Sequence, residues 1–442
     1  MRRIQLQLKK SVDDSYDIVV EKGILRRLGS DLRMKRYAES YVVITDSKVG
    51  RLYASKLVDQ LKREKLFLGK IVVPAGESSK SLEQLKDVLD QMVKMGANRE
   101  TGVIALGGGV VGDLGGFAAA SFMRGVPYIQ IPTTLLAMVD SSVGGKVGVD
   151  LPSGKNLVGA FWQPKKVYID PELLSTLSQK QWKAGLGEAV KYGAIKDRSL
   201  WEYFEQHVKV WNKDPKSFLP GDYMVIEEMI ERCVQIKADV VMKDEREGNL
   251  RQILNYGHTF GHVIELMSDF KVLHGEVVAS GMRIAAELAN RLRFLSDAEL
   301  KKHNDLLDVL NIGKAKTQGL IKEFVQHMRK DKKAKGTLRV VLVDRIGRCH
   351  QELGNYGMRV DEKLIAEVLK EGKWVNDLTS DGARVRMKDS SLTSSPVSSI
   401  SWGNTYQSPS ESSPDVETDL QRRLREMRER AEERRRMGGS GG

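Results

Sequence analysis

The chain has 442 residues, of which 41% are hydrophobic and 29% are charged. This length and balance exclude a small disulfide-stabilised fold and a wholly disordered chain, and they predict more than one globular domain. The two cysteines, Cys233 and Cys349, are far apart in sequence, which excludes a disulfide framework and favours a cytoplasmic location. We see no signal peptide at the N-terminus and no apolar stretch long enough to cross a bilayer, so no membrane partner is expected.

The net charge of +12 is compatible with either nucleic acid or a small anionic substrate as the partner. Eight arginines between residues 422 and 436 carry part of this excess, so it does not all belong to the folded part. We therefore expect a small anionic substrate, and we regard nucleic acid as the weaker alternative.

Four short apolar runs divide the first part of the chain, at residues 41–46, 70–74, 102–106 and 128–132. A segment with helical periodicity lies between the second and the third run, at residues 81–89. Buried strands that alternate with helices predict a parallel sheet, and ligands of such sheets bind at the carboxyl ends of the strands. We interpret residues 1–175 as an α/β, Rossmann-like domain.

A glycine-rich motif, Gly107 to Gly112 followed by Asp113, comes directly after the third run and opens a helix. It fits the pattern in which glycines let the backbone approach a pyrophosphate at a helix N-terminus. The acidic residue expected about 20 positions later is missing, so the motif is equally compatible with tight packing of a strand on a helix.

Two further segments contain charged residues in loops. Residues 74–80 place Glu77 and Lys80 after the second run, which suits ribose binding but also an ordinary capping turn. Lys146 and the pair Lys155–Asn156 lie in glycine-rich segments, where lysines suit a phosphate or carboxylate better than a simple solvated surface.

Long amphipathic patterns dominate after about residue 171, and they predict helices at 181–195, 225–243, 255–267, 276–292 and 319–328. A strand pair is expected at 338–343 and 348–353. We interpret residues 176–375 as an all-α, metal- and substrate-binding domain. Residues 376–442 are Ser-rich and then Arg-rich, and they predict a disordered tail with a marginal charged helix at 415–437. A partner- or RNA-binding arm is the alternative for this tail.

Three of the 7 histidines fall within one short stretch, as His258, His262 and His274. The first two are spaced i, i+4 and would share a helix face, which is a metal-binding geometry. Two imidazoles with one carboxylate suit a catalytic zinc, and Glu188 is the candidate carboxylate. A helix cap or a buried hydrogen-bonding role remains the alternative for any single histidine.

Six motifs together resemble the 3-dehydroquinate synthase family of sugar phosphate cyclases, over about residues 16–370. They are GGGVVGDLGGF, FMRGVPYIQIPTTLLAMVDSSVGGKVGVD, GKNLVGAFWQP, GLGEAVKYG, LNYGHTFGH and LHGE. The resemblance implies NAD and one divalent metal, zinc or cobalt, as cofactors, and it implies a homodimer.

The resemblance also implies roles for individual residues. The metal ligands would be Glu188, His258 and His274, so that His262 becomes a catalytic or substrate-binding residue instead of a ligand. Residues expected in the substrate site with His262 are Asp140, Lys146, Lys191, Arg251 and Asn255. Residues expected to bind the substrate phosphate are Arg124, Lys155, Asn156, Lys332 and Lys333. Residues expected to contact NAD are Asp46, Glu77, Lys80, Gly108, Gly109, Asp113, Thr133, Thr134, Lys146, Lys155 and Thr176.

The reaction that the resemblance implies converts 3-deoxy-D-arabino-heptulosonate 7-phosphate to 3-dehydroquinate and phosphate, a step of aromatic amino acid biosynthesis. It proceeds by transient oxidation, phosphate elimination, reduction and aldol closure. A related sugar phosphate cyclase is the first alternative, although Arg251 and Asn255 suit a carboxylated substrate. A metal-dependent polyol dehydrogenase, which would consume NAD, is the second.

Overall fold

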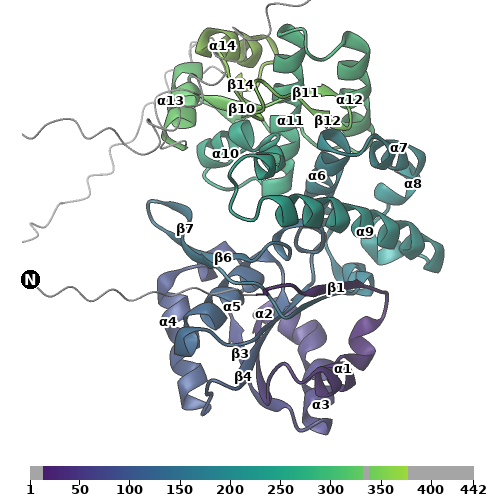
Figure 1. Cartoon of the computed structure of the whole chain (residues 1–442). Helices are drawn as coiled ribbons and strands as arrows, with labels where there is room; N and C mark the ends of the chain where they lie inside the picture. Colours follow the sequence, from purple (N-terminus) through teal and green to yellow (C-terminus); the bar gives the residue numbers. More distant parts are fainter. Residues whose placement is uncertain (1–12, 332–337, 377–442) are drawn as a thin grey trace, which may run out of the picture. The chain divides into compact units, whose positions relative to one another are not determined.

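The structure is a computed structural model that describes residues 13–331 and 338–376 of the chain, and its first part is built on a parallel sheet (Figure 1). Within these residues the sheet has six strands, in the order β1-β8-β5-β4-β2-β3. Their bounds are β1 (Asp17–Val20), β2 (Ser40–Asp46), β3 (Phe67–Val73), β4 (Thr101–Gly107), β5 (Tyr128–Pro132) and β8 (Lys166–Ile169). The four predicted strands are confirmed, whereas β1 and β8 were not predicted, because four residues are too few to show a period.

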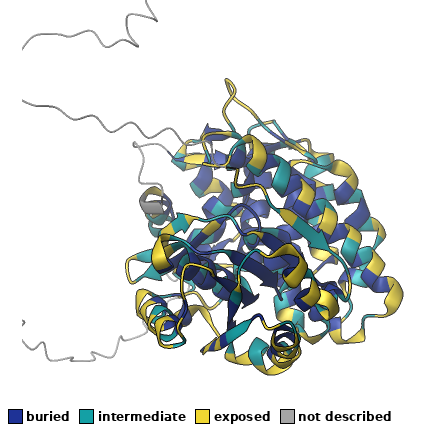
Figure 2. Cartoon of the chain, turned by 60° about the horizontal axis from the view of Figure 1, so that its bottom comes forward, coloured by how far each residue is buried: buried dark blue, intermediate teal, exposed yellow. Residues whose placement is uncertain are grey.

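Helices cover both faces of this sheet. Alternate residues of β2 point to opposite sides, so that Tyr41 and Val43 belong to one apolar cluster while Val42 and Ile44 belong to another. The first cluster includes α1 (Leu28–Lys35) and α3 (Ser55–Arg63), and the second includes α4 (Leu82–Lys94) and α5 (Gly109–Ser121). The inner strands β2, β4, β5 and β8 are accordingly buried along almost all of their length, whereas the edge strands β1 and β3 are partly exposed, as are the outer faces of the helices (Figure 2). Burial on both faces explains why the inner strands are almost continuously apolar.

The order of the strands creates a switch point between β2 and β4. From β2 the chain moves outward to β3 and then returns to the other side of β2 to form β4. Ligands of open parallel sheets bind outside the carboxyl ends of the strands at such a point. Asp46 ends β2 and Gly108 follows β4, so both flank the crevice predicted to bind the dinucleotide.

An antiparallel hairpin of β6 (Lys146–Leu151) and β7 (Gly154–Phe161) follows the sheet strand β5 and was not predicted. Five glycines between residues 144 and 159 hide its alternation of side chains. Gly148 and Gly159 oppose each other in register, and a Cβ on Gly148 would lie only 2.5 Å from the Val158 carbonyl oxygen. The hairpin carries Lys146 and Lys155, two of the residues predicted for the site.

The second part of the described chain is mainly helical. The helices are α6 (Gln179–Ile195), α7 (Arg198–Gln206), α8 (Val208–Trp211), α9 (Pro220–Lys243), α10 (His258–Met267), α11 (His274–Arg291), α12 (Asp297–Val309), α13 (Ile321–Asp331) and α14 (Glu362–Glu371). All five predicted helices are present. The one expected from residue 255 begins at His258, because residues 250–255 form a 3-10 helix and Gly257 adopts a φ of 81°.

Short two-stranded ladders interrupt these helices, so the prediction of an all-α second domain needs correction. The strands are β9 (Thr317–Gln318), β10 (Arg339–Val341), β11 (Val343–Arg345), β12 (Arg348–Cys349), β13 (Gly357–Arg359) and β14 (Val375–Asn376). The pairing expected between 338–343 and 348–353 is only partly confirmed: β11 pairs with β12, whereas β10 pairs with β13. Strands of two or three residues carry no periodicity from which a partner could be predicted.

Close backbone contacts hold α6, α10 and α11 together. A Cβ on Gly275 of α11 would clash with the carbonyl group of Ala184 in α6, and one on Gly187 would clash with Gly275. A Cβ on Gly257, just before α10, would lie 2.5 Å from the carbonyl oxygen of Val278 in α11. Only glycine permits these approaches, which bring the backbones of the three helices close together.

Both cysteines are buried free thiols. Cys233 lies on α9 with its sulfur 3.7 Å from the carbonyl oxygen of Ala189 in α6. Within residues 13–331 and 338–376, every helix is too short or too polar to span a lipid bilayer.

The structure does not test the predicted boundaries between the domains and the tail. The described residues fall into one compact unit, so the division at residue 175 stays a prediction. The predicted tail lies outside the described residues from position 377 onward.

Candidate active site

Glu188 and three histidines converge where α6, α10 and α11 meet. The ligand atoms that His258, His262 and His274 can offer all lie within 4.8 Å of one another. Glu188 Oε1 is 3.3 Å from Nε2 of His258 and 3.4 Å from Nε2 of His274. The structure thus brings together both the pair expected from spacing and the set implied by the resemblance.

The two histidines that face Glu188 have pKa values shifted in opposite directions by their surroundings. Burial lowers the pKa of His258 to about 4, which keeps its imidazole neutral and able to coordinate a metal. Burial would also lower the pKa of His274, but Glu188 and Glu265 outweigh it and raise that pKa to about 9. In the protein alone, a proton on His274 therefore supplies positive charge between the two carboxylates.

The Glu188 carboxylate fits a bound cation. It is fully buried, and neither oxygen makes a hydrogen bond of normal geometry with the described residues. Burial would raise its pKa, but Lys191, with its Nζ 2.5 Å from Oε2, and His258 hold that pKa well below the usual range. Oε2 is thus paired with Lys191, whereas Oε1 faces two imidazole nitrogens, and one carboxylate oxygen with two imidazoles is a donor set that a tetrahedral zinc or cobalt ion prefers.

Asp140 lies in a second buried charge group beside this cluster. Its carboxylate accepts hydrogen bonds from the Tyr192 hydroxyl at 2.7 Å and from Lys237 Nζ at 2.8 Å. Burial would raise the pKa of Asp140, but Lys237 and Lys191 lower it. The group therefore presents an ionised carboxylate and two lysines next to the metal-binding candidates.

Glu247 joins two residues predicted for the substrate site. Its carboxylate lies 2.6 Å from Lys146 Nζ and accepts a hydrogen bond from the Asn255 side chain at 2.8 Å. Arg251 is buried nearby and donates to the carbonyl oxygens of Glu245 and Gly144. Lys146 and Asn255 thus contact one carboxylate, and the charge of Arg251 helps to lower the pKa of that carboxylate.

The β6–β7 hairpin brings its charged residues against both parts of the chain. Lys155 Nζ lies 3.0 Å from Glu265 of α10 and 3.7 Å from Glu77. Asn156 accepts a hydrogen bond at 2.5 Å from the buried Lys80, which also pairs with Asp113 at 2.5 Å. The predicted NAD residues Glu77, Lys80 and Asp113 are therefore linked to the two residues expected at the phosphate.

The glycines in the loop after β4 pack closely against neighbouring side chains, next to buried hydroxyl groups and a helix N-terminus. A Cβ on Gly108 would lie 3.1 Å from Thr134, and one on Gly109 would lie 3.2 Å from the Ser141 hydroxyl. The hydroxyls of Thr133 and Ser141 are buried without a hydrogen-bond partner among the described residues. No side chain caps the N-terminus of α5, so its first N–H groups remain available to an anion. These features fit a dinucleotide pyrophosphate.

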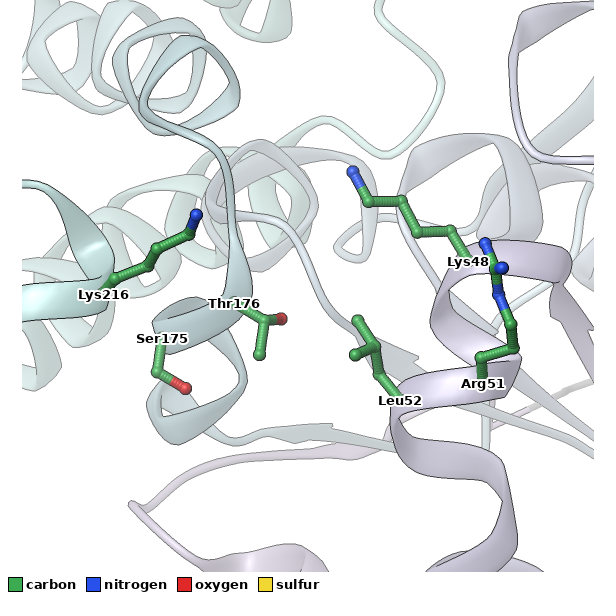
Figure 3. Close-up of a pocket in the computed structure, with 6 residues that line it drawn as sticks. All are labelled: Lys48, Arg51, Leu52, Ser175, Thr176 and Lys216. Carbon is green, nitrogen blue, oxygen red and sulfur yellow. The ribbon is translucent and has the colours of Figure 1, made fainter.

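Thr176, which was also predicted to contact NAD, lines an open pocket of about 440 Å³ that contains none of the other predicted residues. The other residues that line the pocket are Lys48, Arg51, Leu52, Ser175 and Lys216. Lys48 and Lys216 extend toward each other from opposite sides (Figure 3). Asp46 precedes Lys48 and caps α2 (Ser47–Val49) through its carboxylate, so this cationic pocket adjoins the end of β2.

The contacts of Arg124 within the described residues do not connect it to the predicted site. Arg124 ends a 3-10 turn with a φ of 69°, and no hydrogen bond or ion pair of its side chain reaches the other predicted residues within the described chain. Lys332 and Lys333 lie outside the described residues, so their roles stay predictions.

Lys237, Glu247 and Glu265 were not among the predicted residues. A signal for two of them exists in the sequence: Lys237 follows Ile236 on a buried helix face, and Glu265 follows Val263 and Ile264. A buried charge within an apolar helix face indicates a partner elsewhere. Glu247 has no such signal, because it lies in a polar segment and its contact with Lys146 spans 101 residues.

Comparisons with known proteins agree with this geometry. The family model described as 3-dehydroquinate synthase N-terminal matches residues 70–184, and the model described as 3-dehydroquinate synthase C-terminal matches residues 185–334. A 3-dehydroquinate synthase of Prochlorococcus marinus (strain AS9601) is 41% identical over 339 residues, which cover 76% of this chain and 92% of that protein.

Solved structures of other cyclases share the fold. A 2-epi-5-epi-valiolone synthase from Streptomyces hygroscopicus subsp. jinggangensis 5008 with NAD⁺ and Zn²⁺ bound has a TM-score of 0.71 and 28% identity, over 83% of this chain and 98% of that one. A 2-deoxy-scyllo-inosose synthase complexed with carbaglucose-6-phosphate, NAD⁺ and Co²⁺ has a TM-score of 0.69 and 28% identity, over 80% and 96%. Together with the family models and the curated relative, these matches show that the chain belongs to the 3-dehydroquinate synthase family.

Proposed function

We propose that the chain converts 3-deoxy-D-arabino-heptulosonate 7-phosphate to 3-dehydroquinate and phosphate, with NAD⁺ and one divalent metal as cofactors. The observation that carries this proposal is the convergence of His258 and His274 on the buried Glu188, whose Oε1 lies 3.3 Å and 3.4 Å from their Nε2 atoms. Membership of the family and the motifs quoted above support the same reaction.

In this proposal Glu188, His258 and His274 hold the metal, and His262 faces the substrate. The neutral His258 needs no deprotonation, whereas a cation would displace the proton of His274. When bound, the metal supplies a Lewis acid that polarises a substrate hydroxyl. Lys191 remains paired with Glu188 and adds positive charge at the same place.

The dinucleotide is assigned to the crevice between the ends of β2 and β4. Gly108, Gly109 and the N-terminus of α5 would receive the pyrophosphate, while Asp46 and Thr176 would lie toward the adenosine. When bound, NAD⁺ supplies a hydride acceptor that returns the hydride later, so that no net NADH forms. Thr133, Thr134, Glu77, Lys80 and Asp113 complete the proposed contacts.

The remaining residues orient the substrate and balance its charge. Lys146 and Asn255, which contact Glu247 in the protein alone, and Arg251 would bind the carboxylate and hydroxyl groups of the substrate. Lys155 and Asn156, with Arg124, Lys332 and Lys333, would hold the phosphate, which leaves by β-elimination after taking the neighbouring proton itself. Asp140 would position the lysines around it. Orientation and charge stabilisation thus supply most of the catalysis.

Turnover of the heptulosonate phosphate with NAD⁺ and Zn²⁺ tests the proposal. We expect release of inorganic phosphate and formation of a cyclic product, with no net rise in NADH absorbance. A stoichiometric rise in NADH would favour a polyol dehydrogenase. Phosphate release only from a sugar phosphate that lacks a carboxylate would favour another cyclase of the family and would contradict the assignment of Arg251 and Asn255.

The homodimer and the cytoplasmic location stay predictions from the resemblance and the composition. Sedimentation of the purified chain measures the first, and fractionation of cells measures the second.

A further inference from the structure

Glu265 lies between a proposed metal ligand and the β6–β7 hairpin. It belongs to α10, and its side chain is 6% exposed. One carboxylate oxygen, Oε1, is 3.0 Å from Lys155 Nζ on β7, and the other, Oε2, is 3.7 Å from Nδ1 of His274 on α11. A buried carboxylate with one oxygen toward a lysine ammonium group and the other toward an imidazole N–H has little freedom to turn.

The two ring nitrogens of His274 face different carboxylates. Nε2 is directed to Glu188 at 3.4 Å, where the metal is proposed to bind, and Nδ1 is directed to Glu265. A metal-binding imidazole commonly donates its other N–H to a carboxylate, which fixes the ring orientation and makes the coordinating nitrogen more basic. His258 differs, because its Nδ1 is 3.3 Å from the carbonyl oxygen of Tyr256.

We infer that Glu265 is a positioning residue, which orients His274 toward the metal and is itself fixed by Lys155. This inference rests on the proposed function, since it assigns His274 to the metal. The inference also predicts that Lys155 influences the metal site indirectly. Lys155 pairs with Glu265, which is the only carboxylate facing Nδ1 of His274 among the described residues.

Titration of the full-length, metal-free protein with Co²⁺, followed by the visible absorption of the bound ion, tests the inference. In Glu265→Gln, the amide keeps the shape but loses the charge, and we expect about 10- to 100-fold weaker Co²⁺ binding. Glu287→Gln is the matched control, because Glu287 lies on the same helix as His274 but about 20 Å farther along it. This control should bind Co²⁺ as the unchanged protein does.

Lys155→Met separates positioning from simple attachment of the hairpin. If Glu265 acts on His274 directly, Lys155→Met should weaken Co²⁺ binding less than Glu265→Gln does. Equal losses in the two variants would mean that Glu265 only anchors the hairpin, and they would overturn the inference.

The remaining outcomes are also decisive. Co²⁺ affinity in Glu265→Gln equal to that of the unchanged protein would overturn the inference while leaving the proposed function intact. Failure of the unchanged protein to bind Co²⁺ would instead defeat the proposed function. If circular dichroism shows that Glu265→Gln does not fold, Glu265→Asp takes its place as the test variant. Aspartate keeps the charge but is one methylene shorter, so the carboxylate is farther from His274 and Co²⁺ binding should be weaker. Unaltered Co²⁺ binding in Glu265→Asp would overturn the inference.

Discussion

The helical junction and the end of the sheet achieve binding in different ways. At the junction of α6, α10 and α11, glycines bring helix backbones into contact, and three histidines gather beside the buried Glu188. At the end of β2, exposed lysines and an arginine surround an open pocket, and none of them forms an ion pair within the described residues. The side chains of the helical junction are therefore already positioned in the protein alone, whereas the exposed lysine and arginine side chains of the pocket would become ordered only when a ligand binds.

This difference predicts how each region responds to change. A preorganised cluster loses function almost completely when one member is removed, because the remaining groups cannot move to compensate. Exposed cations contribute little individually, because water and salt screen them. The following substitutions test whether the two regions differ in this way.

The largest effect is expected from His258→Ala, which removes a proposed ligand. Loss of the Lewis acid removes several kcal/mol of transition-state stabilisation, so the rate of phosphate release should fall by about 10³-fold or more. Metal content by mass spectrometry and phosphate release measure this directly. His350→Ala is the control, since that imidazole stacks on Phe294 away from the cluster. A metal-free His258→Ala protein with full activity would refute the metal assignment.

A smaller but still severe effect is expected from Gly275→Ala. The added methyl group would clash with the carbonyl group of Ala184 and separate α11 from α6. Overpacking of this kind costs about 1–3 kcal/mol of unfolding free energy, and it should weaken metal binding as well. Urea unfolding measures the first quantity. Gly221→Ala on α9, where a Cβ meets nothing within 4 Å, should leave stability equal or slightly raised.

Removing two cations from the pocket should have a modest effect. In a Lys48→Ala, Lys216→Ala double variant, we expect NAD⁺ affinity to fall about two- to fivefold at low salt, because exposed charges contribute less than about 1 kcal/mol each. High salt should abolish the difference. Calorimetry at two salt concentrations measures both, with the exposed Lys56→Ala as control. A loss as large as that of His258→Ala would mean that the two regions do not differ as described.

The smallest effect is expected from deleting residues 377–442. This segment lies outside the described residues and beyond the family models, which end at residue 334. The shortened chain should turn over substrate at the unchanged rate, as measured by phosphate release. A large loss of turnover would give the segment a catalytic role.

The sequence predicted those parts of the fold whose signal is local. Long apolar strands such as β4 and amphipathic helices such as α9 show their period within a few residues. The β6–β7 hairpin was missed because its glycines erase the alternation. Likewise, the i, i+4 spacing of His258 and His262 predicted a shared helix face, whereas the approach of His258 to Glu188 and of both histidines to His274 depends on helix packing that no local pattern encodes.

Contacts between distant segments explain the residues that were missed in the site. Lys237 lies 97 positions from Asp140, and Glu265 lies 110 positions from Lys155. Each charge is visible in the sequence, and Lys237 and Glu265 even interrupt apolar helix faces. What the sequence did not specify was the partner, because pairing across such separations follows from the tertiary fold.

Cys233 gives the helical junction a built-in reporter. Burial raises the pKa of its thiol, and the sulfur lies against the helix that carries Glu188. A thiol that is buried and protonated reacts with alkylating reagents only when the surrounding structure opens. The rate at which Cys233 is alkylated in native protein therefore measures how often α9 separates from α6, and a cation held at the neighbouring cluster would slow it.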